Sequence, residues 1–273
     1  MMDASFLSYG FLQKALLMAI ISGATCGAVG VFIVLWRVGF LGICVSHAAF
    51  AGALISLWIG VPPLAGGMIG SLGAAAMVGP MADRSNLSPD TAIGVIFSVA
   101  LSLAVLALAM LPGARTEGLN FLWGSLLTVT HFDLILMAVA AVVLFSFIYL
   151  FFKEIQATIS QRQAAIAAGI PAQAIFYIIL ILLGLIVAIA LKAVGGILIY
   201  ALIITPAATA LQLTYSLKHM FLLSAFVGFV ASVIGLWISF YWAIPTGAAI
   251  VLTATLLLVI AIIFSPKKQR WFS

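Results

Sequence analysis

Two side chains that can bind a transition metal, Cys44 and His47, lie close together in an otherwise apolar stretch. They are three residues apart, so on a helix they share a face. Thiolate and imidazole are both good ligands for zinc and other borderline-soft metals. Ser46 lies beside the pair, and together these residues are a candidate metal site. The alternative is a neutral His47 bonded to a helix carbonyl, with Cys44 as a small packing residue, because one pair supplies only two ligands.

Two further groups of polar residues interrupt apolar sequence. Pro206 lies between Thr205 and Thr209, where proline kinks a helix and the hydroxyls can either bond back to the helix or line a path. The alternative is a kink that serves packing alone. His131 and Asp133 lie at a predicted helix start at the outer mouth, where they can collect a cation, and the alternative is capping by Asp133. The sequence contains no HExxH motif and no nucleophile–base pair, so a hydrolase is not indicated.

The composition identifies the environment of these residues. The chain has 273 residues, of which 66% are hydrophobic and 6% are charged. A soluble domain usually has about 25% charged residues, so this composition excludes a soluble enzyme, a secreted disulfide module and a disordered chain. It predicts an all-α fold, a polytopic α-helical membrane protein.

The spacing of the charges predicts the number of spans. Charge-free intervals, divided at about 20 residues per helix, give about nine transmembrane helices, within a range of eight to ten. Two long intervals hold two spans each, because they are broken at Gly60-Val61-Pro62-Pro63 and at Ile244-Pro245-Thr246-Gly247. One full span is expected between Lys192 and Lys218. The segment Leu119–Thr130 lies in an interval too short for a span and is predicted to be a short interfacial or re-entrant helix.

The distribution of cations predicts the orientation, because cytoplasmic loops carry an excess of Lys and Arg. With nine spans, one side of the membrane receives three cations, Lys14, Arg115 and Lys192. The other side receives Arg37, Arg84, Lys153, Arg162, Lys218, Lys267, Lys268 and Arg270. The N-terminus is therefore expected outside and the C-terminus in the cytoplasm. The net charge of +5 reflects this bias in the loops, and no nucleic-acid partner is expected.

The most polar stretch of the chain is Lys153–Ala172, on the predicted cytoplasmic side. At 100° per residue, Ile155, Ile159 and Ile166 fall within about 40° of one another, and Arg162 lies on the same stripe. One helix with Ile, Arg and small residues on a single face suits a groove in another protein. The alternative is an ordinary interfacial connector.

Five blocks of sequence resemble one family in order. Gly42–Ala49, with His47, resembles the Gly-Asp-Ala-Leu-Ser-His-Ala run in the second helix of permease subunits of zinc, manganese and iron ABC importers. The other four blocks, each similar to the family's corresponding segment, are Asp90–Ser98, Asn120–Ser125, Val194–Ala210 and Ile244–Leu252. The resemblance covers about Gly39 to Leu252.

This resemblance implies a single transmembrane permease domain over residues 1–273, with the ABC importer permease fold, in the bacterial inner membrane. Such a permease pairs with a second copy of itself or a homologous permease, with two ATPase subunits and with an external metal-binding protein. The transported divalent metal is its cargo, no cofactor is bound permanently, and ATP acts on the partner, so the chain is not itself an enzyme. The coupling segment, about 153–172, would contact the ATPase through Glu154, Ile155, Ile159, Arg162, Ile166 and Gly169.

The chain departs from the family pattern at the metal-binding motif. His47 matches the family's histidine, whereas Ile43 occupies the position of its aspartate and cannot coordinate a metal. Losing a hard oxygen ligand disfavours manganese. One prediction is that Cys44 and His47 of two subunits form a Cys2His2 set suited to zinc. The alternative is a pore without a true binding site that passes a metal delivered from outside. A second departure is Ser160-Gln161-Arg162-Gln163, which replaces the acidic residues expected in the coupling segment.

Two other function classes compete with an ABC permease. A single-chain secondary transporter or channel for a small cation often contains inverted repeats and intramembrane acids, and the sequence has no convincing repeat and no Asp or Glu at span centres. A structural or assembly membrane protein would have no central cavity. Co-purification with a nucleotide-binding subunit separates the permease from both.

Overall fold

The computed structural model describes residues 10–85, 87–110, 124, 126–196 and 198–267, and all regular secondary structure in these ranges is helical. The helices are α1 (Gly10–Leu35), α2 (Phe40–Ile59), α3 (Pro63–Ser85), α4 (Pro89–Ala109), the short 3₁₀ turn η1 (Leu126–Thr128), α6 (His131–Leu150), α7 (Phe152–Ser160), α8 (Arg162–Ala167), α9 (Ala172–Val194), α10 (Ile199–Leu213), α11 (Leu217–Trp242) and α12 (Thr246–Ile263).

Eight of the described helices are long and apolar enough to cross a membrane: α1, α2, α3, α4, α6, α9, α11 and α12. The predicted all-α membrane fold is therefore confirmed. The interval expected to hold one more span contains α10, an apolar helix of 15 residues. At 1.5 Å per residue α10 is about 22 Å long, shorter than a hydrocarbon core of about 30 Å. Gly195, with a φ of 95°, ends α9, and the chain turns there before α10 begins.

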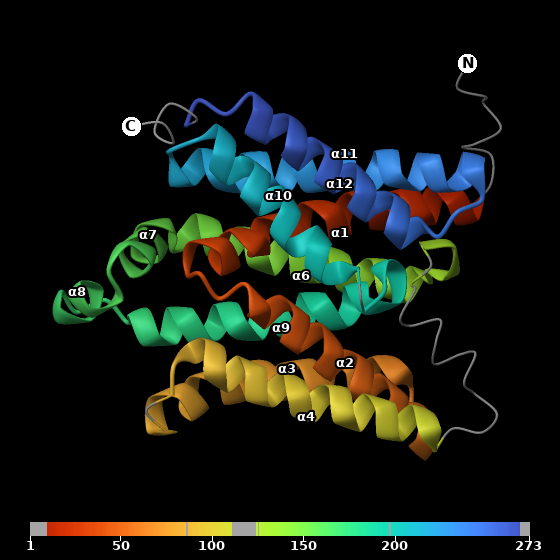
Figure 1. Cartoon of the computed structure of the whole chain (residues 1–273), viewed down its shortest axis with the longest axis horizontal. Coiled ribbons are helices and arrows are strands. Elements are labelled where there is room, and N and C mark those ends of the chain that lie inside the picture. Colours follow the sequence, from red (N-terminus) through yellow and green to blue (C-terminus); the bar gives the residue numbers. More distant parts are fainter. Residues whose placement is uncertain (1–9, 86, 111–123, 125, 197, 268–273) are drawn as a thin grey trace.

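The long helices run roughly parallel to one axis, and α7 and α8 lie together at one end, which we call the coupling end (Figure 1). The first helix begins at the opposite end and α12 finishes at the coupling end. The cations Arg37, Lys153, Arg162, Lys218 and Lys267 belong to turns and helix ends at the coupling end. Lys14 of α1 and Lys192 of α9 belong to the opposite end, and Arg115, Lys268 and Arg270, which the prediction also used, lie outside the described residues.

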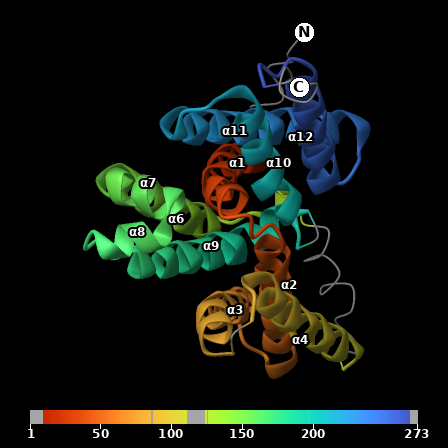
Figure 2. The ribbon, with the colours of Figure 1, turned by 60° about the vertical axis from the view of Figure 1, so that its left-hand side comes forward.

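Helix α1 is the central element, and it packs closely against α10 and α11 because small residues face both neighbours (Figure 2). A Cβ atom built on Gly27 would lie 2.4 Å from the carbonyl oxygen of Ser224 in α11. One built on Gly30 would lie 1.8 Å from the carbonyl oxygen of Ile203 in α10. The Ser224 hydroxyl donates a hydrogen bond of 2.5 Å to the Gly27 carbonyl. In lipid, where the hydrophobic effect does not drive helices together, small residues allow the close van der Waals packing that does.

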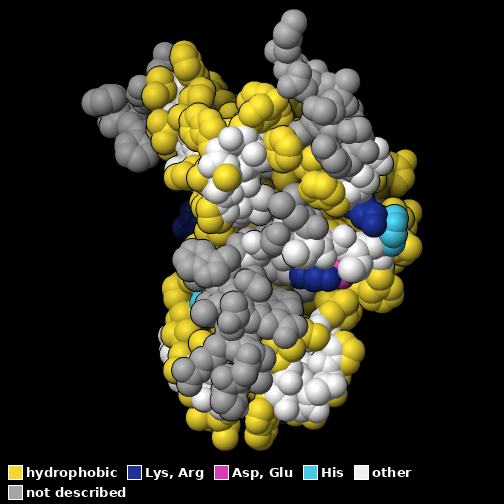
Figure 3. All heavy atoms as spheres, turned by 90° about the vertical axis from the view of Figure 1, so that its right-hand side faces the viewer, with side chains coloured by type: hydrophobic (Ala, Val, Ile, Leu, Met, Phe, Trp, Pro, Cys, Tyr) yellow, Lys and Arg dark blue, Asp and Glu magenta, His cyan; other side chains and the backbone are white. Residues whose placement is uncertain are grey.

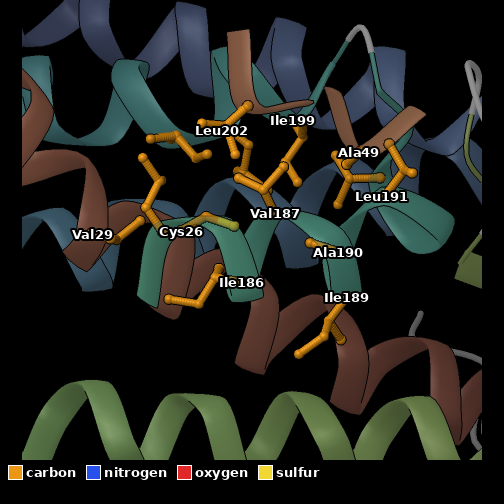
Figure 4. Close-up of a cluster of buried hydrophobic side chains, with 14 of the residues drawn as sticks. Cys26, Val29, Ala49, Ile186, Val187, Ile189, Ala190, Leu191, Ile199 and Leu202 are labelled. Carbon is orange, nitrogen blue, oxygen red and sulfur yellow. The ribbon is translucent and has the colours of Figure 1, made fainter. Parts of the chain in front are cut away.

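Helices α2, α3 and α4 form a second group, and α9 packs against both groups (Figure 2). Its buried face includes Ile186, Val187 and Leu191, which belong to a cluster that also contains Cys26 of α1, Leu202 of α10 and Ala49 of α2 (Figure 4). The apolar contacts of α9 therefore set the relative positions of the α1–α10–α11 group and the α2–α3–α4 group.

Side-chain caps fix two helix starts that the sequence indicates. The Ser88 hydroxyl accepts a hydrogen bond of 3.2 Å from the Thr91 amide at the beginning of α4. At α6, Thr130 and Asp133 form a reciprocal capping box. Most of the predicted interfacial or re-entrant segment, 119–123 and 125, lies outside the described residues. Its described end is η1, in which Leu126 is buried.

Candidate functional site

His47 lies on the second turn of α2, about 10 Å from its start at the coupling end, and its side chain is half-buried. Its Nδ1 atom is 2.9 Å from the carbonyl oxygen of Ile43. A carbonyl only accepts, so Nδ1 is the donor, and in the Nδ1–H tautomer Nε2 has a free lone pair. Phe97 of α4 holds the imidazole edge-to-face, with ring centroids 5.1 Å apart. The ring is thus oriented by a carbonyl and an aromatic contact, with one nitrogen able to bind a metal.

Ile43 lies one turn before His47 on the same face of α2 and is also half-buried. Its carbonyl oxygen accepts from His47 Nδ1 and from the Ser46 hydroxyl, at 2.9 and 3.0 Å. Its side chain is a hydrocarbon, so the position that could place an oxygen ligand beside His47 is apolar. Phe40, a turn further toward the coupling end, contacts the same Phe97 ring at 5.2 Å.

Cys44 and Ser46 lie on the interior side of α2. Both side chains are 0% exposed, and Cys44 is a free thiol within the hydrophobic core. His47, in contrast, is half-buried. Within one chain, the thiol of Cys44 and the imidazole of His47 therefore share neighbouring positions on the helix but not a common accessible surface.

The hydroxyls of α10 are also directed into the bundle. Thr205 is 8% and Thr209 is 2% exposed, and the Thr209 hydroxyl donates to the Thr205 carbonyl at 2.8 Å. Pro206 is buried between them, and a Cβ atom built on Gly27 of α1 would lie 3.4 Å from its Cβ. The proline segment is thus in contact with α1 in this conformation.

The predicted outer-mouth residues lie at the end opposite α8. His131 is exposed at the first position of α6, whereas Asp133 is 7% exposed. The Asp133 Oδ2 atom accepts from the Thr130 amide and hydroxyl, at 2.9 and 2.8 Å, and from Lys192 Nζ of α9 at 2.8 Å. Among the described side chains visible on this end face, few are charged, and hydrophobic side chains gather at its flanks (Figure 3). Asp133 is therefore engaged as a cap and an ion-pair partner.

The polar segment after α6 differs from the predicted single helix. Gln161 adopts an extended conformation, with φ −155° and ψ 99°, and divides the segment into α7 and α8. The expectation of one continuous apolar stripe is wrong, because this break reorients everything after residue 160. Ile155 is 0% exposed and Ile159 is half-buried, so both pack toward the bundle.

The exposed tip of the segment consists of α8 and the turn that follows it. Ile166 is 50% exposed, and Gly169, with a φ of 81°, ends the tip in an exposed left-handed turn. Glu154 is half-buried on α7. Arg162 does not point away from the bundle: its guanidinium carbon lies 4.7 Å from the centre of the Phe176 ring in α9.

A cavity of about 530 Å³ lies between α2, α3 and α4 and is lined by apolar side chains, glycines and Ser56. Neither Cys44 nor His47 lines this cavity. Among the residues that the structure describes, no three His, Cys, Asp or Glu side chains are grouped so that they could hold a metal ion. Within the described residues, His47 is therefore an isolated, half-buried imidazole.

Sequence reasoning missed two residues that shape these sites. Phe97 orients His47 from another helix, and no local pattern indicates such a contact. Lys192 pairs with Asp133 from 59 residues away. Here a signal was available, because lone charges of opposite sign at the ends of two spans are candidates for pairing.

Comparison with known proteins identifies the family. A model of the ABC 3 transport family matches residues 8–265. The chain belongs to this family. It is therefore a permease, a multi-pass transport subunit of the plasma membrane that is not itself an enzyme and that works with a separate ATPase and a substrate-binding partner.

Relatives of similar length match this permease along nearly all of the chain. The manganese transport system membrane protein MntC of Listeria innocua is 34% identical, covering 98% of this chain and 95% of the relative. The manganese import system permease protein ScaB of Streptococcus gordonii is also 34% identical, covering 96% and 94%. The solved structure of PsaBC from Streptococcus pneumoniae in complex with Fab superposes with a TM-score of 0.87 at 34% identity, covering 98% of both chains.

Proposed function

We propose that this permease imports a divalent transition metal and that His47 of two subunits contacts the metal on its way through the membrane. The metal class is supported by the relatives, whose names describe manganese transport. The observation that carries the site is the orientation of His47, with Nδ1 bonded to a carbonyl and Nε2 left with its lone pair. A secondary transporter or channel, the alternative considered from the sequence, does not fit the family.

The site is incomplete in one subunit, and a second copy or a homologous permease would complete it. A single imidazole is a weak metal site, whereas two or more ligands converging on one ion give a specific one. In this proposal Cys44 and Ser46 lie behind His47, and the thiol joins the ligand set when α2 turns during the transport cycle. The kinked segment Thr205–Thr209 gives α10 the freedom to move beside α2.

The replacement of an acidic ligand by Ile43 bears on the choice of metal. Carboxylate oxygens suit manganese, and imidazole with thiolate suits zinc. We therefore propose zinc as the preferred cargo of this permease over manganese. An Ile43→Asp variant, which restores an oxygen ligand one turn from His47, is expected to shift uptake toward manganese.

The test uses the complete transporter, permease with ATPase and binding protein, in lipid vesicles that contain a metal-sensitive dye. His47→Ala is expected to reduce zinc uptake at least about tenfold. His219→Ala is the matched control, because His219 is exposed in the first turn of α11 and belongs to a different helix from His47. The Cys44→Ser variant measures how much the Cys44 thiol contributes to zinc uptake. Equal zinc uptake in the His47→Ala and His219→Ala transporters would refute the site.

We further propose that α8 docks in the cytoplasm on one of two ATPase subunits, with Ile166 and Gly169 at the contact and Glu154 beside it. Ile166 supports this assignment, because a half-exposed isoleucine at the tip of a polar segment suits an apolar groove of a partner. The coupling end would then be cytoplasmic, with the N-terminus outside and the C-terminus inside. Ile166→Glu is expected to release the ATPase during co-purification, whereas Gln163→Glu, exposed on the same helix, is expected to retain it. Retention by both variants would refute this docking site.

A further inference from the structure

Five side chains from four parts of the chain form a continuous column of ring contacts between the coupling segment and the centre of the bundle. It begins at α8, crosses α9 and the end of α1, and finishes on α11. We call this set the aromatic column; its members are Arg162, Phe176, Trp36, Phe32 and Phe221.

Each step of the aromatic column is a direct contact. The Arg162 guanidinium lies 4.7 Å from the Phe176 ring centre, and the Phe176 and Trp36 centroids are 4.8 Å apart. Trp36 is 5.7 Å from Phe32, which is 5.1 Å from Phe221 of α11. These separations are within the range of favourable cation–π and aromatic pairs.

The column becomes more buried toward the centre of the bundle. Arg162, Phe176 and Trp36 are half-buried, whereas Phe32 is 0% and Phe221 is 6% exposed. Its inner end is therefore fixed in the core, and its outer end is the point at which α8 attaches.

The position of Trp36 links the column to the helix that carries His47. Trp36 follows α1 directly, and Arg37 beside it has a φ of 58°, a left-handed conformation that is unfavourable for arginine. This tight turn leads through Val38 into α2, so a displacement of Trp36 acts on the start of α2 as well as on α1.

The attachment of α8 depends strongly on Arg162. Gln161 immediately before it is extended, and α8 itself is only six residues long with one buried side chain, Ala165. Helix α7 is held separately by Ile155 and by Thr158, which is 2% exposed. A short helix with so little buried surface is held in one orientation by few contacts, and the contact of Arg162 with Phe176 is a specific one among them.

We infer that Arg162 is a positioning residue that fixes α8 on the aromatic column, so that movement of the ATPase at the tip is transmitted to α1 and α2 and is not lost in rotation of α8. The inference rests on the docking of α8 proposed above. It assigns Arg162 a role inside the permease, whereas the sequence alone had placed this residue at the ATPase contact. Coupling through Arg162 predicts that ATP hydrolysis and metal uptake separate when the contact is removed.

The experiment compares uptake per ATP hydrolysed by the complete transporter in vesicles, with zinc and manganese tested separately. Arg162→Ala is expected to retain assembly and ATPase activity but to lower metal uptake per ATP at least about fivefold. Phe176→Leu removes the ring that Arg162 contacts and is expected to have the same effect on metal uptake per ATP. Arg162→Lys, which keeps a cation over the ring, is expected to recover much of the coupling. Lys218→Ala, which removes an exposed cation at the coupling end outside α7 and α8, is the matched control and is expected to match the unaltered transporter.

A second measurement does not depend on the cargo. Hydrogen exchange of the α8 backbone amides, in the assembled transporter, is expected to be faster in Arg162→Ala than in Lys218→Ala, whereas exchange of the α7 amides is expected to be the same in both. If the unaltered transporter moves neither metal and α8 exchange still differs between the two variants, the proposed cargo is wrong and the positioning role stands. If uptake per ATP and α8 exchange in Arg162→Ala both equal those in Lys218→Ala, the inference is overturned, and Phe176→Leu decides the same question should Arg162→Ala fail to assemble.

Discussion

Replacing Gly30 by alanine tests whether backbone contact between α1 and α10 holds the bundle together. The added Cβ would lie 1.8 Å from the Ile203 carbonyl oxygen and 3.3 Å from the Ala207 Cβ. An ordinary close C···O contact is about 3.3 Å, so the two helices must separate locally by about 1.5 Å. The obstacle is backbone, which cannot rotate away as a side chain would.

The magnitude follows from two opposing effects. Overpacking in a closely packed interior costs about 1–3 kcal/mol, and the rigid carbonyl places this substitution near the upper value. Alanine is favoured over glycine within a helix by about 1 kcal/mol, which offsets part of that cost. The net expectation is a destabilisation of about 2 kcal/mol, or a fall in melting temperature of roughly 4–8 °C for a chain of this size.

Thermal unfolding of the purified permease in detergent, followed by tryptophan fluorescence at one fixed scan rate, measures this effect. Gly73→Ala is the matched control, because a Cβ there meets nothing within 4 Å, so this helical glycine should gain stability on substitution. The two variants are expected to shift in opposite directions. A Gly30→Ala permease at least as stable as Gly73→Ala would refute the reasoning that close backbone approach organises the α1–α10 contact.

Two further predictions concern the charges at the helix ends. Asp133→Asn is expected to lower stability by about 1 kcal/mol relative to Asp90→Asn, an exposed first-turn control, because one Asp133 oxygen serves both the cap and Lys192. In the double variant, Lys192→Met should add little to the destabilisation caused by Asp133→Asn. If the decreases in melting temperature of the two single variants added fully, this would contradict a shared interaction. Lys267 Nζ donates to the Leu211 and Thr214 carbonyls at the end of α10, although burial lowers the pKa of this ammonium below its ordinary value. Lys267→Met is expected to speed hydrogen exchange in the last turn of α10, with Lys218→Met as the exposed control, and unchanged exchange would rule out this C-terminal cap.

The spans could be predicted from the sequence because the bilayer makes each one locally self-sufficient. A segment in hydrocarbon must satisfy its backbone groups within its own helix, so length and charge spacing were enough to place eight of the long helices. The capping role of Asp133 was similarly accessible, because a capping side chain acts within three residues of its own position. The shorter length of α10 could not be predicted, since Lys192 lies inside the last turn of α9 and gives no boundary for the next helix.

The side of each helix that packs against its neighbours could not be predicted in the same way. Spans that are apolar on every side carry no amphipathic signal to show which face meets another helix. Sequence spacing placed Cys44 and His47 on one helix face, yet packing against neighbouring helices buries the thiol completely and leaves the imidazole half-exposed. The stripe of Ile155, Ile159 and Ile166 failed for a related reason, because one extended residue, Gln161, breaks the helical phase.

The sequence by itself determined that this chain is a polytopic helical membrane protein, because the hydrophobic solvent imposes its constraints residue by residue along the chain, and five blocks that resemble one family indicated a permease. It also identified His47, since an ionisable group in an apolar span is conspicuous without any structure. Only the tertiary structure decided which groups act on one another: Phe97 on His47, Lys192 on Asp133, and Phe176 on Arg162. Such pairs join helices that are distant in sequence, and their formation depends on the packing of whole helix faces, which no local spacing specifies.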